Sequence, residues 1–148
     1  MVVLDASVLL KWFYPREAEE DADTALAFRR RLLEGRLTIA VPSFALYEAA
    51  HSLRHSTYRL PPATVRARIR DLWSMGVTRV PITRRLLWSA VEMSFLYNVP
   101  VYDAYYFAVA QHKRCPCVTA DRRAFRRVRA IPWMHYLGDV RDVGVFDD

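Results

Sequence analysis

The sequence predicts an α/β fold of three layers, in which helices cover both faces of a central parallel sheet. Short apolar runs alternate with longer stretches of helical periodicity along the whole chain, a pattern typical of parallel sheets. No internal repeat, low-complexity tract or Gly/Ser-rich linker interrupts the 148 residues. We therefore predict one domain spanning residues 1–148, with a core supplied by the 53% of residues that are apolar.

The predicted strands are short and almost continuously apolar, as expected for strands buried on both faces. They are expected at residues 2–5, 37–41, 77–80 and 117–119, with a weaker strand near 134–137. The carboxyl ends of such strands form the edge of the sheet where α/β proteins bind their ligands.

The predicted helices fill the segments between these strands. They are expected at residues 7–13, 17–34, 42–56, 61–75, 84–97 and 101–113, with a short basic helix after Asp121. The segment 17–34 is acidic at its start and basic at its end, as the helix dipole favours, and Gly35 terminates it. Thr83 is a suitable cap for the helix that starts at Arg84.

Membrane and secreted proteins do not fit this composition. No apolar stretch reaches the roughly 18 uncharged residues of a membrane helix, and the N-terminus lacks the basic start of a signal peptide. The two cysteines, Cys115 and Cys117, are too close in sequence for an unstrained disulfide and too few for a zinc site. We expect a cytoplasmic protein in which both thiols are small buried side chains.

Arginine dominates the basic residues, and the formal net charge is +6. Arginine binds phosphate through two parallel hydrogen bonds, but a GC-rich genome produces the same bias, so composition alone leaves nucleic acid open. The densest basic segment directly follows Asp121 and contains Arg122, Arg123, Arg126 and Arg127. We predict that these four arginines bind nucleic-acid phosphates, with a solvated helix face as the alternative.

Four acidic residues are expected to converge at the carboxyl edge of the sheet. Asp5 ends the first strand, and Asp121 follows the fourth. Asp103 heads an apolar helix stripe, where a buried carboxylate is costly unless it is paired or bound to a metal. Glu48 lies opposite the apolar face of its helix. Each acid alone also has an ordinary explanation, as a cap, a first-turn residue, a turn residue or a solvent-facing residue.

Together the four acids predict a site for divalent cations. Carboxylate oxygens are hard ligands that suit Mg²⁺ or Mn²⁺, and such ions activate water for the hydrolysis of phosphodiester bonds. Ser7 and Thr119 each lie two residues from an acid and could orient a carboxylate or a water from behind. We therefore predict that Asp5, Glu48, Asp103 and Asp121 are the catalytic and metal-binding residues.

Four segments of the sequence carry a resemblance to a known family. They are Val-Val-Leu-Asp5-Ala-Ser7, Val-Pro-Ser-Phe-Ala-Leu-Tyr-Glu48, Val-Tyr-Asp103-Ala-Tyr-Tyr and Val-Thr119-Ala-Asp121-Arg-Arg. In this order and spacing the chain resembles PIN-domain ribonucleases, most closely the VapC-type toxins of toxin–antitoxin pairs. The resemblance implies Mg²⁺- or Mn²⁺-dependent endonucleolytic cleavage of RNA, a homodimer, and inhibition by a small antitoxin protein.

Other functions remain open at this point. A non-catalytic PIN-like protein that binds RNA or a partner would keep the fold and the basic surface. A nuclease that processes RNA or DNA without being a toxin would keep the acids as well. A di-iron site at Glu48-Ala-Ala-His51 is excluded, because the chain lacks the second copy of the motif that such a site needs.

Overall fold

The computed structural model describes all 148 residues and is built around a five-stranded parallel sheet. The strands are β1 (Val2–Leu4), β2 (Ile39–Pro42), β3 (Thr78–Val80), β4 (Cys117–Thr119) and β5 (Met134–Tyr136). Their order across the sheet is β3-β2-β1-β4-β5, and every neighbouring pair is parallel. The predicted fold class, a parallel sheet between two layers of helices, is confirmed.

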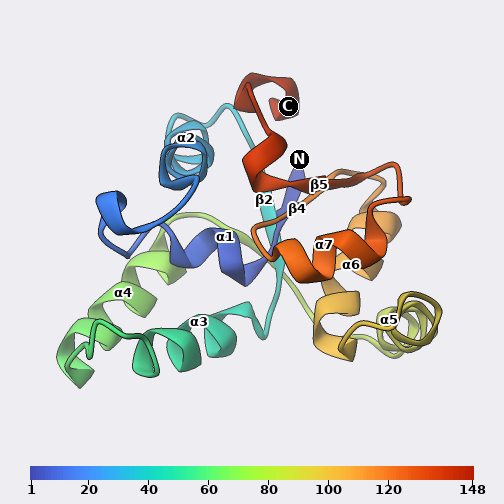
Figure 1. Ribbon diagram of the computed structural model, residues 1–148, viewed down its shortest axis with the longest axis horizontal. Helices are drawn as coiled ribbons and strands as arrows, with labels where there is room; N and C mark the ends of the chain where they lie inside the picture. The colour runs from blue at the N-terminus through green and yellow to red at the C-terminus, as the bar shows by residue number, and fades with distance from the viewer.

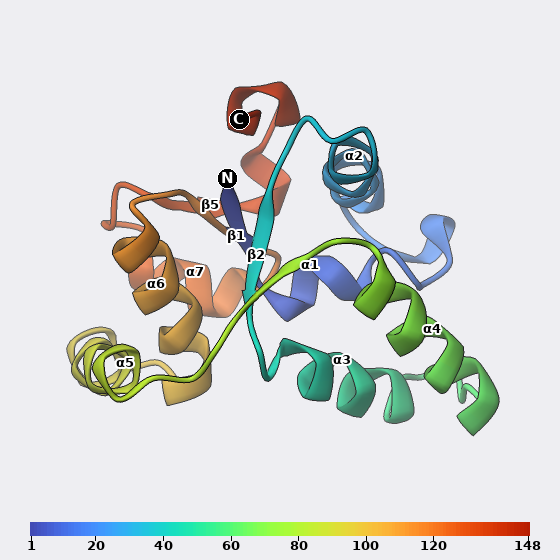
Figure 2. The same cartoon turned by 180° about the vertical axis from the view of Figure 1, so that it is seen from behind.

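Seven α-helices connect the strands. They are α1 (Ala6–Leu10), α2 (Ala22–Leu33), α3 (Ala45–Arg54), α4 (Pro62–Ser74), α5 (Arg84–Tyr97), α6 (Val101–Lys113) and α7 (Arg122–Val128). Helices α1 to α4 lie on one side of the sheet and α5 to α7 on the other (Figures 1 and 2). None of these helices combines the length and the apolar character that crossing a membrane requires.

The direction in which strands are added to the sheet reverses beside β1. From β1 the chain moves outward to β2 and β3, and then returns past β1 to β4 and β5. Because crossovers between parallel strands are right-handed, the helices after β1 and after β4 cover opposite faces of the sheet. The carboxyl ends of β1 and β4 therefore lie at a topological switch point, where open α/β sheets bind ligands.

Helix α6 explains why its sequence is apolar on nearly every side. It packs across β1, β2 and β4 on one face and against α5 on the other. All residues from Ala104 to Ala110 are buried. The same core contains Cys115 and Cys117 as free thiols, and burial raises the pKa of both. The prediction that the cysteines are small buried side chains is confirmed.

The predicted helix over residues 17–34 is wrong at its start. Residues Arg16–Ala18 form a single 3-10 turn, and α2 begins only at Ala22. Asp21 adopts a left-handed backbone conformation, with φ of 56°, which ends any continuous helix there. Glu19 holds the turn in place, since it accepts hydrogen bonds from Lys11 and from the hydroxyl of Tyr58. Tertiary contacts thus override local helical preference.

The last twelve residues form two 3-10 turns, Leu137–Asp139 and Val143–Phe146, that the sequence did not predict. Asp147 forms ion pairs with Arg31 and Arg36. Asp148 accepts hydrogen bonds from the amino terminus and from Thr38, so the two ends of the chain lie together (Figures 1 and 2).

We expect Trp12 to be an anchor between α1 and α2. Its side chain is buried, and its indole N–H donates to the carbonyl of Ala25 at 2.8 Å. Replacing Trp12 with Phe removes this bond and leaves a void, and should lower the free energy of unfolding by about 1–3 kcal/mol. Urea unfolding of the variant measures the loss. Trp73→Phe is the matched control, because Trp73 is 57% exposed; equal losses in both variants would contradict the anchor.

Candidate active site

The four predicted acids all lie at helix N-termini beside the switch point. Asp5 and Asp121 are the N-cap residues of α1 and α7, directly after β1 and shortly after β4. Glu48 and Asp103 lie in the first turns of α3 and α6. The partial positive charge of each helix N-terminus favours a carboxylate there. Helix α3 and the start of α6 border the same end of the sheet (Figure 2).

The hydroxyl of Thr119 connects two of these acids. Thr119 is the one polar residue in the buried set, and its hydroxyl donates to Asp5 Oδ2 at 2.6 Å. The same oxygen accepts the backbone N–H of Asp121 at 3.0 Å. Ser7 completes the link, because its hydroxyl accepts the N–H of Ala120 at 3.0 Å and lies 3.4 Å from that of Thr119. Ser7 and Thr119, the two predicted hydroxyl residues, therefore fix the orientation of Asp5 and the backbone of residues 120 and 121.

Glu48 is held by a residue that the sequence did not identify. The hydroxyl of Tyr106, on α6, donates to Glu48 Oε2. Burial raises the pKa of Glu48 to about 7; the bond from Tyr106 opposes this shift, and the charge of Asp5 adds to it. One signal could have revealed Tyr106: a tyrosine within a fully apolar helix needs a partner for its hydroxyl. Tyr106 also follows Asp103 by three residues, which places the two on the same side of α6.

Asp103 is the least compensated of the four acids. Burial is the main cause that raises its pKa from the usual 3.8 to about 7. The charges of Asp5, Asp121 and Glu48 raise the pKa of Asp103 further. No hydrogen bond opposes the shift. Because the charges of the other three acids shift the pKa of Asp103, the four carboxyl groups lie near one another.

The donor chemistry of this acidic site fits a hard divalent cation. It offers only carboxylate oxygens, three of its acids (Asp5, Glu48 and Asp103) have raised pKa values, and no lysine lies among them. As the side chains stand, no three His, Cys, Asp or Glu residues form a group that could hold an ion. The carboxylates repel one another, and Asp5, Glu48 and Asp121 turn an oxygen to a hydrogen-bond donor instead.

The four predicted arginines are exposed on α7, next to Asp121. Arg122, Arg123, Arg126 and Arg127 span about 140° around this helix, so they share one broad face. Arg122 is partly engaged, because its guanidinium lies over the ring of Tyr136 and donates to the Tyr136 hydroxyl. Arg123, Arg126 and Arg127 form no ion pair and can bind an anion.

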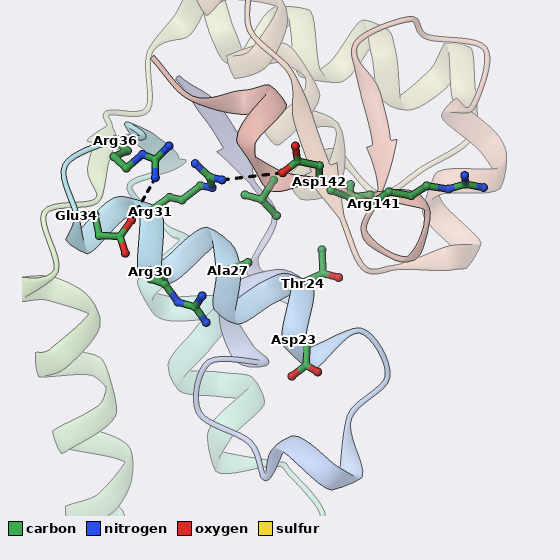
Figure 3. Close-up of a pocket in the computed structure, with 11 residues that line it drawn as sticks. Asp23, Thr24, Ala27, Arg30, Arg31, Glu34, Arg36, Arg141 and Asp142 are labelled. Carbon is green, nitrogen blue, oxygen red and sulfur yellow. Dashed lines mark ion pairs between the residues drawn. The ribbon is translucent and has the colours of Figure 1, made fainter.

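A cavity of about 420 Å³ lies between α2 and the C-terminal segment, away from the acidic site (Figure 3). None of the four acids lines it. Some of its charged side chains are paired within the protein, Arg31 with Asp142 and Arg36 with Glu34, each at 3.9 Å, whereas Arg30 and Arg141 form no ion pair. The pair of Arg31 with Asp142 attaches the C-terminal segment to α2.

The parallel sheet, the acids at the switch point and their hydroxyl partners define a class of protein. The family model of the PIN domain matches residues 2–131, and the chain belongs to this family. No curated protein sequence matches it.

Three solved structures are similar in fold. A toxin–antitoxin complex from Klebsiella pneumoniae has a TM-score of 0.67 at 17% identity and covers 95% of this chain and 100% of its own. FitAcB from Neisseria gonorrhoeae has a TM-score of 0.67 at 12% identity, with coverage of 95% and 100%. VapC20 of Mycobacterium tuberculosis, a toxin that cleaves the Sarcin-Ricin loop, has a TM-score of 0.62 at 18% identity, with coverage of 81% and 88%.

The raised pKa of Asp103 predicts how stability depends on pH without metal. A carboxyl whose pKa is higher in the folded state binds its proton more tightly there, so stability falls as the pH rises from about 4 through 7. Asp103→Asn removes this charge. At pH 8 in EDTA the substitution should raise the free energy of unfolding by at least about 1 kcal/mol. This value is well below the full pKa shift converted at about 1.4 kcal/mol per unit. Urea unfolding at pH 4.5, where the gain should be much smaller, and at pH 8 measures it.

Glu92→Gln is the control for this experiment, because Glu92 is an exposed acid on α5 outside the site. It should leave stability unchanged at both pH values. A pH-independent effect of Asp103→Asn would contradict the electrostatic origin of the gain.

Proposed function

We propose that the protein is a divalent-metal-dependent endoribonuclease and the toxin of a toxin–antitoxin pair. The observation that carries the proposal is the convergence of Asp5, Glu48, Asp103 and Asp121 at the switch point of a PIN-family sheet. Burial and mutual repulsion raise the pKa values of three of them, Asp5, Glu48 and Asp103, which is the condition that a bound cation relieves. Bound Mg²⁺ or Mn²⁺ supplies an activated water and neutralises charge on the attacking and leaving oxygens of the phosphodiester.

The residues of the chain then have separate roles. Asp5, Asp103 and Asp121 hold the cation through their carboxylates, and Glu48 completes the ligand set or orients the attacking water. Tyr106 fixes Glu48 from behind. Thr119 and Ser7 fix Asp5 and the backbone that leads to Asp121. Because these supports are buried hydrogen bonds on strands and helices, the acids keep their positions when a substrate arrives.

RNA as the substrate is supported by the basic face of α7. A phosphate chain that crosses the acidic site would meet Arg123, Arg126 and Arg127 on the adjacent helix. The similarity to VapC20, a toxin that cleaves the Sarcin-Ricin loop, agrees with this choice of substrate. The cytoplasmic location expected from the sequence remains a prediction.

The partners in the proposal are a small antitoxin and a second copy of the chain. The similarity to a toxin–antitoxin complex from Klebsiella pneumoniae supports the antitoxin. A stripe of exposed apolar side chains on α5, Trp88, Val91 and Phe95, supports a homodimer. Their helical spacing places them on one face, and a two-fold axis would bury the same face of both copies.

Asp103→Asn tests the enzymatic part of the proposal. With Mn²⁺ or Mg²⁺ the wild type should cut single-stranded RNA, and EDTA should stop it. The variant should lose at least about 100-fold in rate, because a misassembled metal site forfeits several kcal/mol of transition-state stabilisation. Glu92→Gln should cleave like the wild type. Uncut RNA with wild-type protein and Mn²⁺ would favour a non-catalytic binding protein.

A double charge reversal, Arg123→Glu with Arg127→Glu, tests the basic face. It should weaken RNA binding and reduce the slope of log K against log salt concentration by about 1 to 2, because two phosphate contacts are lost. Fluorescence anisotropy at several salt concentrations measures both quantities. The matched control is Arg66→Glu with Arg70→Glu on α4, which changes the net charge equally. Equal effects of the two pairs would make the α7 arginines ordinary surface charge.

A further inference from the structure

Another cavity directly borders the acidic site. The cavity has a volume of about 570 Å³ and is lined by Phe44, Tyr47, Glu48, His51, Ser52 and Tyr102. Its size falls within the range of about 300–1,000 Å³ that is usual for small-ligand sites. Glu48 belongs to both the cavity and the acidic site, and Tyr102 directly precedes Asp103 in α6. Whatever occupies this cavity therefore lies next to the acids.

The aromatic side chains of this cavity are unusually exposed. Tyr47 is 81% and Tyr102 57% exposed, and neither hydroxyl forms a hydrogen bond within the protein. Phe44 is fixed, because its ring makes edge-to-face contacts with Tyr105 and Tyr106 at centroid distances of 5.4 and 5.7 Å. A preformed ring beside two exposed rings offers flat apolar faces to a ligand.

Charge and polarity limit the kind of ligand. The carboxyl of Glu48 repels a phosphate group, so the cavity does not suit the backbone of a nucleic acid. An uncharged aromatic ring with polar edges fits better, since Ser52 and His51 provide hydrogen-bonding groups beside the aromatic faces. A protein partner finds a purely apolar surface elsewhere, on the α5 stripe of Trp88, Val91 and Phe95.

We propose that the cavity of Phe44, Tyr47 and Tyr102 binds one unstacked nucleobase of a single-stranded RNA beside the phosphate that is cut. This inference rests on the proposed ribonuclease function and specifies its substrate. In a double helix the bases are stacked on one another, whereas a loop or single strand can turn a base outward onto aromatic side chains. The cavity thus selects single-stranded RNA and sets the register of cleavage.

The test measures binding without cleavage. Every protein carries Asp103→Asn, and the probe is a single-stranded oligoribonucleotide with 2-aminopurine, a fluorescent base that is quenched when it stacks. Binding should quench the probe. Tyr102→Ala should weaken binding about 5- to 100-fold, as expected for the loss of one base–aromatic stack. Tyr102→Phe should restore binding, because it keeps the ring.

Trp73→Ala is the matched control, since Trp73 on α4 is also 57% exposed but lies outside the cavity. A series of oligonucleotides with one abasic position each should reveal a single position whose loss weakens binding, and Tyr102→Ala should be insensitive to that position. Equal binding by Tyr102→Ala and Trp73→Ala, or no sensitive position, would overturn the inference. A change of oligomeric state in Tyr102→Ala with unchanged RNA binding would assign the cavity to a protein partner instead.

Cleavage by the protein without Asp103→Asn separates this inference from the proposed function. If that protein cuts RNA and Tyr102→Ala cuts it with unchanged KM, the nuclease stands and the base site is wrong. If no RNA is cut with Mn²⁺ but the probe is quenched in a Tyr102-dependent way, the base site stands and the nuclease is wrong.

Discussion

The buried hydroxyl of Thr119 is the interaction on which the site depends. It donates to Asp5 at the end of β1 and accepts the backbone N–H of Asp121 after β4. These strands are neighbours at the point where the chain reverses its direction across the sheet. One hydroxyl thus ties together the two segments that diverge there and sets the spacing of two carboxylates. Ser7 reinforces the tie through the N–H of Ala120.

The site balances repulsion against helix dipoles. Four acids at short range would repel one another, and each lies at the N-terminus of a different helix, where partial positive charge offsets part of the cost. The balance remains unfavourable for Asp5, whose pKa burial raises, and for Glu48 and Asp103, whose pKa values rise to about 7. The acids therefore lower the stability of the protein, a cost that is common at functional sites.

Sequence reasoning succeeded where a residue's position in the fold follows from its place on an element. Asp5 and Asp121 follow strands, so the carboxyl edge of the sheet brings them together in any fold of this class. Thr83 caps α5 as predicted, accepting the N–H of Leu86. Sequence reasoning failed at residues 17–21, where contacts of Glu19 with Lys11 and Tyr58 break a helix that local periodicity favours. The C-terminal turns likewise depend on pairs such as Arg31 with Asp147.

The four carboxylates, their hydroxyl neighbours, the arginines after Asp121 and the parallel α/β class were determined by the sequence alone. Periodicity and the order of elements are local properties, and they carry this information. Only the tertiary structure decided that Tyr106 holds Glu48, that Arg122 packs on Tyr136, and that Tyr102 lies across a cavity from α3. These contacts join residues far apart in the chain, and their geometry depends on how the helices pack on the sheet.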